Sequence, residues 1–315
     1  MAIGGWLSAA LALSGTPRAL SAQAGGATRV LLVTGLSGEP RFATGFHAAA
    51  SALYDAAQWH WGVPDSSLIY LAENPARDPK RIRGHATRDN LAAALGELAR
   101  RSVPGDLVLV VLIGHGSSQG ADSRLSLPGP DATAGDFAGW LKPLGGRLTV
   151  LVNAASGSGD FLPVLADSSR VVVTATKTAF ERNETTFAEP FARGLGSGAA
   201  DADKDGRVTL LEAFQFAKRE VARGYEARNV LLTEHAQLSD SALARSVAFG
   251  TQPVPADPAV AALYAERRAL EAQVDALRRR KGGLDSLAYE RELERLLLEL
   301  AGKSAAIRAA EARKP

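Results

Sequence analysis

Two apolar runs rich in β-branched residues constrain this chain more than any other feature of its sequence. Leu107–Ile113 and Leu148–Val152 each end abruptly in small and polar residues. Runs of this kind are typical of strands that are buried on both faces, as in a parallel sheet covered by helices. Further apolar runs at 29–36, 68–71 and 170–176 alternate with stretches of helical periodicity. This alternation predicts an α/β fold, a three-layer αβα sandwich around a mostly parallel sheet.

Between these runs, apolar residues recur at the spacing of one helical face. The spacing predicts helices at 42–61, 87–101 and 131–141, and a further helix that starts near 158–160. Thr87 is expected to cap the second of these helices, because a threonine side chain before the first turn accepts a hydrogen bond from an unpaired backbone N–H.

The residues that follow the two central runs form the candidate site. His115 lies in a Gly-His-Gly segment after the first run, and residues 153–157 (Asn-Ala-Ala-Ser-Gly) follow the second. Ligands and catalytic groups of open α/β sheets gather at the carboxyl ends of the strands, so we expect the histidine and the turn to face each other. A histidine base beside a nucleophile on a tight turn is an arrangement suited to nucleophilic catalysis.

These two segments resemble motifs of the caspase/legumain superfamily of cysteine peptidases. There, one strand ends in His-Gly and the next ends in a motif like Asp/Glu/Asn-Ala-Cys-x-Ser-Gly. Aligned without gaps, His115 takes the place of the catalytic histidine, while Asn153 and Ala154 match the approach to the nucleophile. Ala155 fills the cysteine position, and the chain contains no cysteine at all. The resemblance covers residues 29–235 and implies a caspase-like sheet.

The polar loop 177–187 follows the last of the predicted strands. In the superfamily, the equivalent region helps to form the pocket for the substrate side chain. The resemblance therefore makes Asn153, Glu181, Arg182 and Glu184 candidates for a substrate pocket. The alternative is a solvated polar loop without a ligand.

The missing cysteine leaves three hypotheses about function. In the first, which we favour, the chain is a pseudopeptidase that binds a peptide or protein partner in the cleft at the sheet's edge, since loss of a nucleophile leaves only residual catalysis. In the second, it is a hydrolase in which Ser156 attacks and His115 acts as base, although no orienting carboxylate can be assigned. In the third, it is a calcium-stabilised structural or assembly protein in which the carboxyl edge of the sheet is vestigial. For His115 alone, the alternative to a catalytic role is a hydrogen bond to a backbone carbonyl at the end of the strand. Hydrogen-bond reach between Ser156 and His115 would favour the second hypothesis.

Residues 201–212 match the twelve-residue EF-hand pattern at each diagnostic position. The expected ligands are Asp201, Asp203, Asp205, the main-chain carbonyl of Arg207, and Glu212. Carboxylate oxygens at this spacing, with glycine at position 6 for the sharp turn, suit Ca²⁺. A helix is predicted to follow at 209–226. The sequence offers no second loop of this kind as a partner, and the alternative is a metal-free turn whose aspartates cap that helix.

Residues 1–24 are expected to be a secretory signal. An apolar run extends to about Leu13 and is followed by Ala22-Gln23-Ala24, a small-x-small cleavage pattern. Because no Lys or Arg precedes the apolar run, an ordinary N-terminal segment is the alternative. The run is too short for a bilayer-spanning helix. We therefore expect an exported protein, periplasmic or extracellular in a bacterium, with no membrane span in the mature chain.

Charge and cysteine content exclude several kinds of partner and site. The net charge of +2 over 315 residues gives no reason to expect a nucleic-acid partner. The lack of cysteine excludes disulfides, zinc–thiolate sites and a thiol nucleophile.

The composition changes after a proline-containing linker at 251–258, which closes the main domain predicted at 25–250. Residues 259–315 are rich in Ala, Leu, Glu and Arg, with apolar residues at heptad spacing on either side of Gly282-Gly283. This pattern predicts two helices in a hairpin, or a short coiled coil that joins two chains or binds a partner helix.

Overall fold

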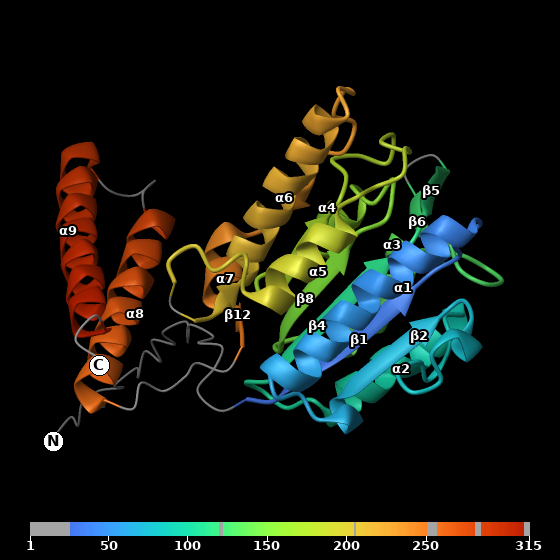
Figure 1. Ribbon diagram of the computed structural model, residues 1–315, viewed down its shortest axis with the longest axis horizontal. Coiled ribbons are helices and arrows are strands. Elements are labelled where there is room, and N and C mark those ends of the chain that lie inside the picture. Colours follow the sequence, from blue (N-terminus) through green and yellow to red (C-terminus); the bar gives the residue numbers. More distant parts are fainter. Residues whose placement is uncertain (1–25, 120–121, 205, 251–256, 281–284, 312–315) are drawn as a thin grey trace, which may run out of the picture.

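A seven-stranded sheet lies at the centre of the protein. The computed structural model describes residues 26–119, 122–204, 206–250, 257–280 and 285–311 (Figure 1). The strands of the sheet are β1 (Thr28–Thr34), β2 (Leu68–Ala72), β3 (Gly84–His85), β4 (Leu107–Ile113), β8 (Leu148–Asn153), β9 (Arg170–Thr174) and β11 (Gln237–Leu238). They lie in the order β11-β9-β8-β4-β1-β2-β3, and only the edge strand β11 is antiparallel to its neighbour among these strands. The predicted α/β fold with a mostly parallel sheet is confirmed.

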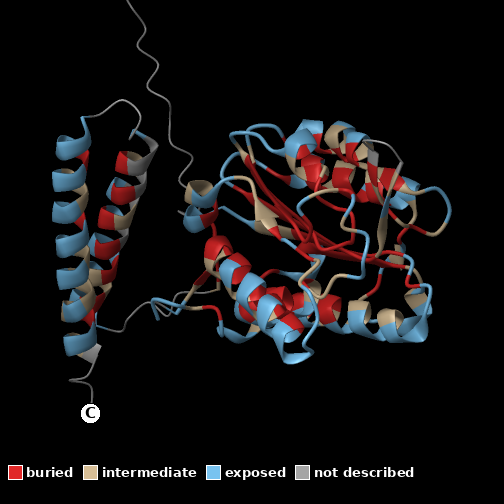
Figure 2. Ribbon diagram, turned by 90° about the horizontal axis from the view of Figure 1, so that it is seen from above, coloured by how far each residue is buried: buried red, intermediate tan, exposed pale blue. Residues whose placement is uncertain are grey.

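Helices cover both faces of this sheet, and the buried sheet lies between them (Figure 2). One face packs against α1 (Pro40–Asp55), α5 (Ala188–Ser197), α6 (Leu210–Ala227) and α7 (Ser241–Ser246), and the other against α2 (Arg88–Arg101), α3 (Ala134–Leu141) and α4 (Phe161–Leu165). Side chains alternate between the two faces along a strand. In β1, Val30 and Leu32 therefore belong to the first apolar cluster, while Leu31 and Val33 belong to the second.

The helix boundaries differ from the expected ones where local hydrogen bonds decide them. Thr87 caps α2 as expected, since its Oγ1 accepts a hydrogen bond of 3.3 Å from Asn90 N. The helix expected from 131 begins instead at Ala134, because Thr133 and Asp136 form a reciprocal capping box. The first helix is α-helical only to Asp55 and continues as a π-helical turn over Ala56–His60.

A small three-stranded sheet follows His115 directly and was not expected from the sequence. It consists of β5 (Gly116–Gln119), β6 (Asp122–Leu125) and β7 (Ala132–Thr133) in antiparallel pairs. Ser117 and Ser118, which the sequence suggests are polar loop residues, lie in β5. Glycine and serine have little intrinsic preference for strands, so pairing rather than local sequence accounts for this element. The small sheet therefore begins directly after the carboxyl end of β4.

Two C-terminal helices, α8 (Pro258–Arg279) and α9 (Ser286–Glu311), stand beside the main domain (Figure 1). Val260 and Tyr264 at the start of α8 pack with Ile307 near the end of α9, so the two helices run antiparallel. The proposed signal at 1–24 and residues 251–256 of the linker lie outside the described residues. Within the described part of the chain, no helix has both the length and the apolarity needed to cross a bilayer.

Candidate functional site

His115 lies at the carboxyl end of β4 with its ring fixed on two sides. Its Nε2 atom is 3.2 Å from the carbonyl oxygen of Ser37. Because a carbonyl oxygen only accepts, Nε2 carries the proton and donates it, so Nδ1 is the unprotonated nitrogen of the neutral ring. The ring also packs edge-on against Phe42 and Phe46, with centroid distances of 4.5 and 5.3 Å. His115 therefore has a defined orientation, with Nδ1 as the acceptor nitrogen of the neutral ring.

Ser156 is buried and its hydroxyl is bound to the main chain of Gly116. Ser156 Oγ donates a hydrogen bond to the Gly116 carbonyl and accepts one from the Gly116 N–H, both at 3.2 Å. The hydroxyl proton is thus donated to Gly116, the residue that follows His115. Among the hydrogen bonds of the described residues, none joins Ser156 to His115. The structure brings the two segments together, as their parallel strands require, but does not pair the two functional groups.

Ala155 and Asn153 are buried within the turn that ends β8. The Ala155 methyl packs in the apolar cluster on the α2–α3–α4 face and is 1% exposed. The Oδ1 atom of Asn153 accepts a hydrogen bond of 3.1 Å from Ala155 N, which closes a local turn of the kind that asparagine favours. Asn153, expected in a substrate pocket, is also 1% exposed and shapes the turn.

Glu181 links the loop 177–187 to two other segments of the same sheet edge. Its carboxylate accepts hydrogen bonds from Lys177 N at 3.0 Å, His235 N at 3.1 Å and His235 Nδ1 at 2.8 Å. Its carbonyl oxygen accepts a bond of 2.8 Å from Gly157 N. Glu181, expected in a substrate pocket, therefore holds the loop 177–187 against the turn at 153–157.

The other two expected pocket residues are also paired across the sheet edge. Arg182 Nη2 donates a hydrogen bond of 3.1 Å to Ser118 Oγ in β5. Glu184 forms an exposed ion pair of 3.2 Å with Arg41 at the start of α1. Exposed pairs of this type contribute little stability, so a ligand can displace them at small cost.

Glu234 is a buried carboxylate that the sequence analysis did not identify. Its oxygens accept hydrogen bonds from Thr186 N, Thr186 Oγ1 and Phe187 N at 2.8, 3.0 and 2.8 Å. Burial is the main cause of the raised pKa of Glu234, and these hydrogen bonds oppose the shift. Glu234 precedes His235 in an ordinary polar segment, and nothing in that segment distinguishes it as a buried carboxylate. It fixes the end of the loop 177–187 where α5 begins.

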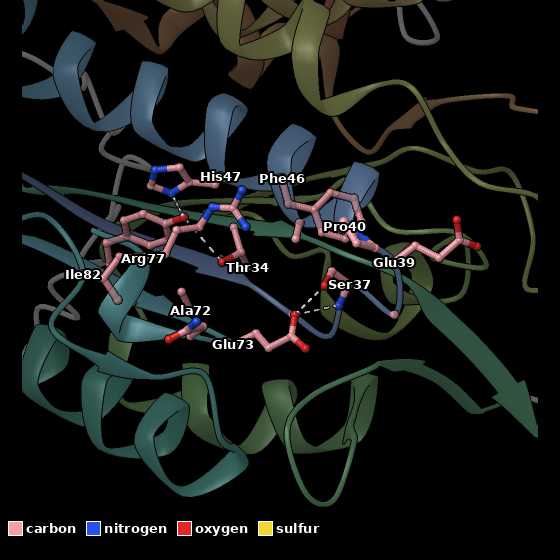
Figure 3. Close-up of a pocket in the computed structure, with 15 residues that line it drawn as sticks. Thr34, Ser37, Glu39, Pro40, Phe46, His47, Ala72, Glu73, Arg77 and Ile82 are labelled. Carbon is pink, nitrogen blue, oxygen red and sulfur yellow. Dashed lines mark hydrogen bonds between the residues drawn. The ribbon is translucent and has the colours of Figure 1, made fainter. Parts of the chain in front are cut away.

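A cavity of about 430 Å³ lies beside His115, between α1 and the carboxyl ends of β1 and β2 (Figure 3). Its polar lining includes Thr34, Ser37, His47, Tyr70, Glu73 and Arg77. The Glu73 carboxylate accepts hydrogen bonds from Ser37 N at 3.0 Å and Ser37 Oγ at 2.6 Å. Burial lowers the pKa of His47 and raises the pKa of Tyr70 to about 12, so both are neutral near pH 7. Because Ser37 also binds His115, the cavity and the histidine share one wall.

The acidic loop brings three of its carboxylates together. Ligand oxygens of Asp201, Asp203 and Glu212 all lie within 4.8 Å of one another, close enough to hold one metal ion. Asp205 lies outside the described residues. Glu212 also accepts hydrogen bonds from Thr209 N and Thr209 Oγ1, both at 2.8 Å, and so closes a capping box at the start of α6.

A short strand pair packs beside the acidic loop. In paired EF-hand loops, a second loop would take the place of the partner strand. β10 (Val208–Thr209) pairs antiparallel with β12 (Ala248–Phe249), so that Val208 at position 8 faces Phe249. The turn itself uses two left-handed residues, Lys204 with φ of 56° and Gly206 with φ of 80°. The partner strand thus comes from the end of the main domain, which the sequence pattern did not indicate.

Comparison with known proteins identifies no relative of this chain. A scan against protein-family models finds no match to the chain, and a search of the curated proteins also finds none.

Proposed function

We propose that the chain is an exported caspase/legumain-like pseudopeptidase that binds a peptide or protein partner at the carboxyl edge of its sheet. The observation that carries the proposal is the state of Ser156, whose hydroxyl is bound on both sides by Gly116. The neighbouring His115 has a fixed ring, but no nucleophilic side chain among the described residues is hydrogen-bonded to it. The edge therefore retains the features of a recognition site without those of a working dyad.

The arrangement of the strands also supports this proposal. His115 follows β4 and the turn at 153–157 follows β8, and these strands are parallel neighbours that pair Leu107 with Leu148 and Leu112 with Asn153. The cavity beside His115 and the exposed Arg41–Glu184 pair lie along the same edge. An extended peptide laid across this edge would need to displace only the exposed Arg41–Glu184 pair, which costs little.

A hydrolase that uses Ser156 has less support from the same distances. A serine nucleophile must give its proton to the base, and here the hydroxyl is bonded to the Gly116 carbonyl. The base of such a dyad is usually oriented by a carboxylate, whereas Nε2 of His115 is bound to the Ser37 carbonyl.

A serine-reactive fluorophosphonate probe tests this proposal directly. We expect no labelling of the mature protein in the presence of calcium, because Ser156 is buried and bonded to Gly116. A cooperative melt would show that the protein is folded, and a known serine hydrolase serves as the positive control. Labelling that disappears in both Ser156→Ala and His115→Ala would establish an active serine and overturn the pseudopeptidase proposal.

We also propose that the loop at 201–212 binds Ca²⁺, with Asp201, Asp203 and Glu212 as carboxylate ligands. Their oxygens converge within 4.8 Å, and the loop has the spacing of hard-oxygen sites. The second half of the loop is fixed by the Thr209–Glu212 capping box and by the pairing of Val208 with Phe249. A single loop anchored in this way suits a structural role for the ion.

Calcium is expected to raise the melting temperature of the mature protein. A ligand at about 100 times its Kd stabilises by about 2.7 kcal/mol, which corresponds to roughly 5–10 °C for a domain of this size. Asp201→Ala should abolish the rise by removing a carboxylate of the cluster. Asp89→Ala, at an exposed position on α2, should keep it. An unchanged melting temperature of the unmodified protein in millimolar calcium would contradict the proposal.

A further inference from the structure

A buried arginine from the C-terminal hairpin lies against the acidic loop. Arg267 of α8 has a side chain that is only 5% exposed, and its Nη2 atom is 3.3 Å from Asp203 Oδ2. Its Nε atom is 3.5 Å from Glu271 on the same helix, and its guanidinium lies over the Tyr264 ring at 5.3 Å. Burial of a charged group is costly unless the group is paired, and Asp203 and Glu271 are two carboxylates that pair with Arg267.

This contact joins two parts of the molecule that otherwise have separate cores. The hairpin packs on itself through its own apolar clusters, and Lys303 of α9 pairs with Glu266 of α8. A cavity of about 500 Å³ between loop and hairpin is lined by Asp203, Lys204, Arg267 and residues of both helices. In Figure 1 the loop between α5 and α6 extends from the domain toward α8. The apolar clusters hold the two helices of the hairpin together, and Arg267 links the hairpin to the acidic loop.

Asp203 has two uses that oppose each other. It is the anchor of Arg267, and its oxygen lies within 4.8 Å of ligand oxygens of Asp201 and Glu212. A divalent cation held by these three carboxylates would repel a guanidinium that sits on one of them. Binding of the ion and docking of the hairpin must then weaken each other by the same factor.

We propose that Arg267 is the built-in cation of the acidic loop, and that Ca²⁺ displaces it and releases the hairpin from the domain. The proposal rests on the calcium site proposed above and adds its regulation. In the absence of calcium, the hairpin is docked through Arg267 and Asp203. In calcium, the ion takes the place of Arg267 at Asp203, and the faces of α8 and α9 that line the cavity become accessible.

The test is calorimetric titration of the mature chain with calcium, at low ionic strength, for four proteins. We expect Arg267→Gln to bind calcium about tenfold more tightly than the unmodified chain, since couplings of this kind are commonly about 5–150-fold. Arg267→Lys keeps the charge and should change the affinity less. Arg295→Gln is the matched control and should leave the affinity unchanged, because the pairs of Arg295 with described residues, Glu292 and Glu299, lie within α9.

A distance measurement completes the test. Because the chain has no cysteine, Gln215→Cys on α6 and Ala301→Cys on α9 allow two fluorophores to be attached at chosen sites. Energy transfer between them should fall when calcium is added. Equal calcium affinities of the unmodified chain and Arg267→Gln, or an unchanged transfer in bound calcium, would overturn the release mechanism and leave the calcium site standing. Failure of every variant to bind calcium would overturn the calcium site itself.

Discussion

Gly116→Ala is expected to lower the free energy of unfolding by about 3 kcal/mol or more, at the upper end of what overpacking costs. A Cβ atom at this position would lie 2.2 Å from the carbonyl oxygen of Ser156 and 2.8 Å from that of Arg124. Both neighbours are main-chain atoms, so no side-chain rotation relieves the clash. The strand β5 would have to separate from the turn at 153–157, and the two hydrogen bonds of the Ser156 hydroxyl would be lost. Equilibrium urea unfolding measures the effect.

Gly45→Ala is the matched control for this substitution. Gly45 is exposed in α1, and no heavy atom of the described residues outside its own helix backbone lies within 4 Å of a Cβ built there. Alanine in a helix interior is more stable than glycine by roughly 0.5–1 kcal/mol, so this variant should gain stability. The same chemical change thus has opposite signs at the two sites. A Gly116→Ala protein as stable as the unmodified one would show that the turn and β5 are not in close contact.

The parts of the fold that the sequence predicts are those buried on both faces. The central run at 107–113 coincides with β4, and the run at 148–152 differs from β8 by one residue. Apolar, β-branched residues have few alternatives to such a position. Because parallel neighbours end at one edge, the proximity of His115 to the turn at 153–157 also follows from the sequence.

The direction of individual side chains at that edge does not follow from the sequence. Ser156 could face His115 or the small sheet, and the choice depends on β5, which has no periodic pattern of its own. Glu234 and Thr186 are 48 residues apart, and nothing in either segment indicates their contact. Arg267 belongs to an amphipathic helix whose charges look solvated in sequence. Such contacts are set by tertiary packing, and they decide what the candidate site can do.

Glu234→Ala is expected to destabilise the main domain by about 3 kcal/mol. Hydrogen bonds to a charged group contribute about 1.5–3 kcal/mol each, and the relief of a buried charge offsets part of the loss. Truncation removes the acceptors for Thr186 N, Thr186 Oγ1 and Phe187 N. The start of α5 and the loop 177–187 should lose protection first, which hydrogen exchange would detect. Glu226→Ala, at an exposed position near the end of α6, should change stability by less than about 0.5 kcal/mol.

The pH dependence of Glu234→Gln separates the charge from the hydrogen bonds. Burial raises the native pKa of Glu234 above the ordinary value of 4.5, so the folded protein binds this proton more tightly than the unfolded chain does. The stability linked to the proton is fully present below 4.5 and is lost as the pH rises through the native pKa. Because glutamine does not titrate, the free energy of unfolding of the unmodified protein, minus that of Glu234→Gln, should decrease over this window and level off above it. A difference that stays constant between about pH 4 and pH 8 would contradict a raised native pKa of Glu234.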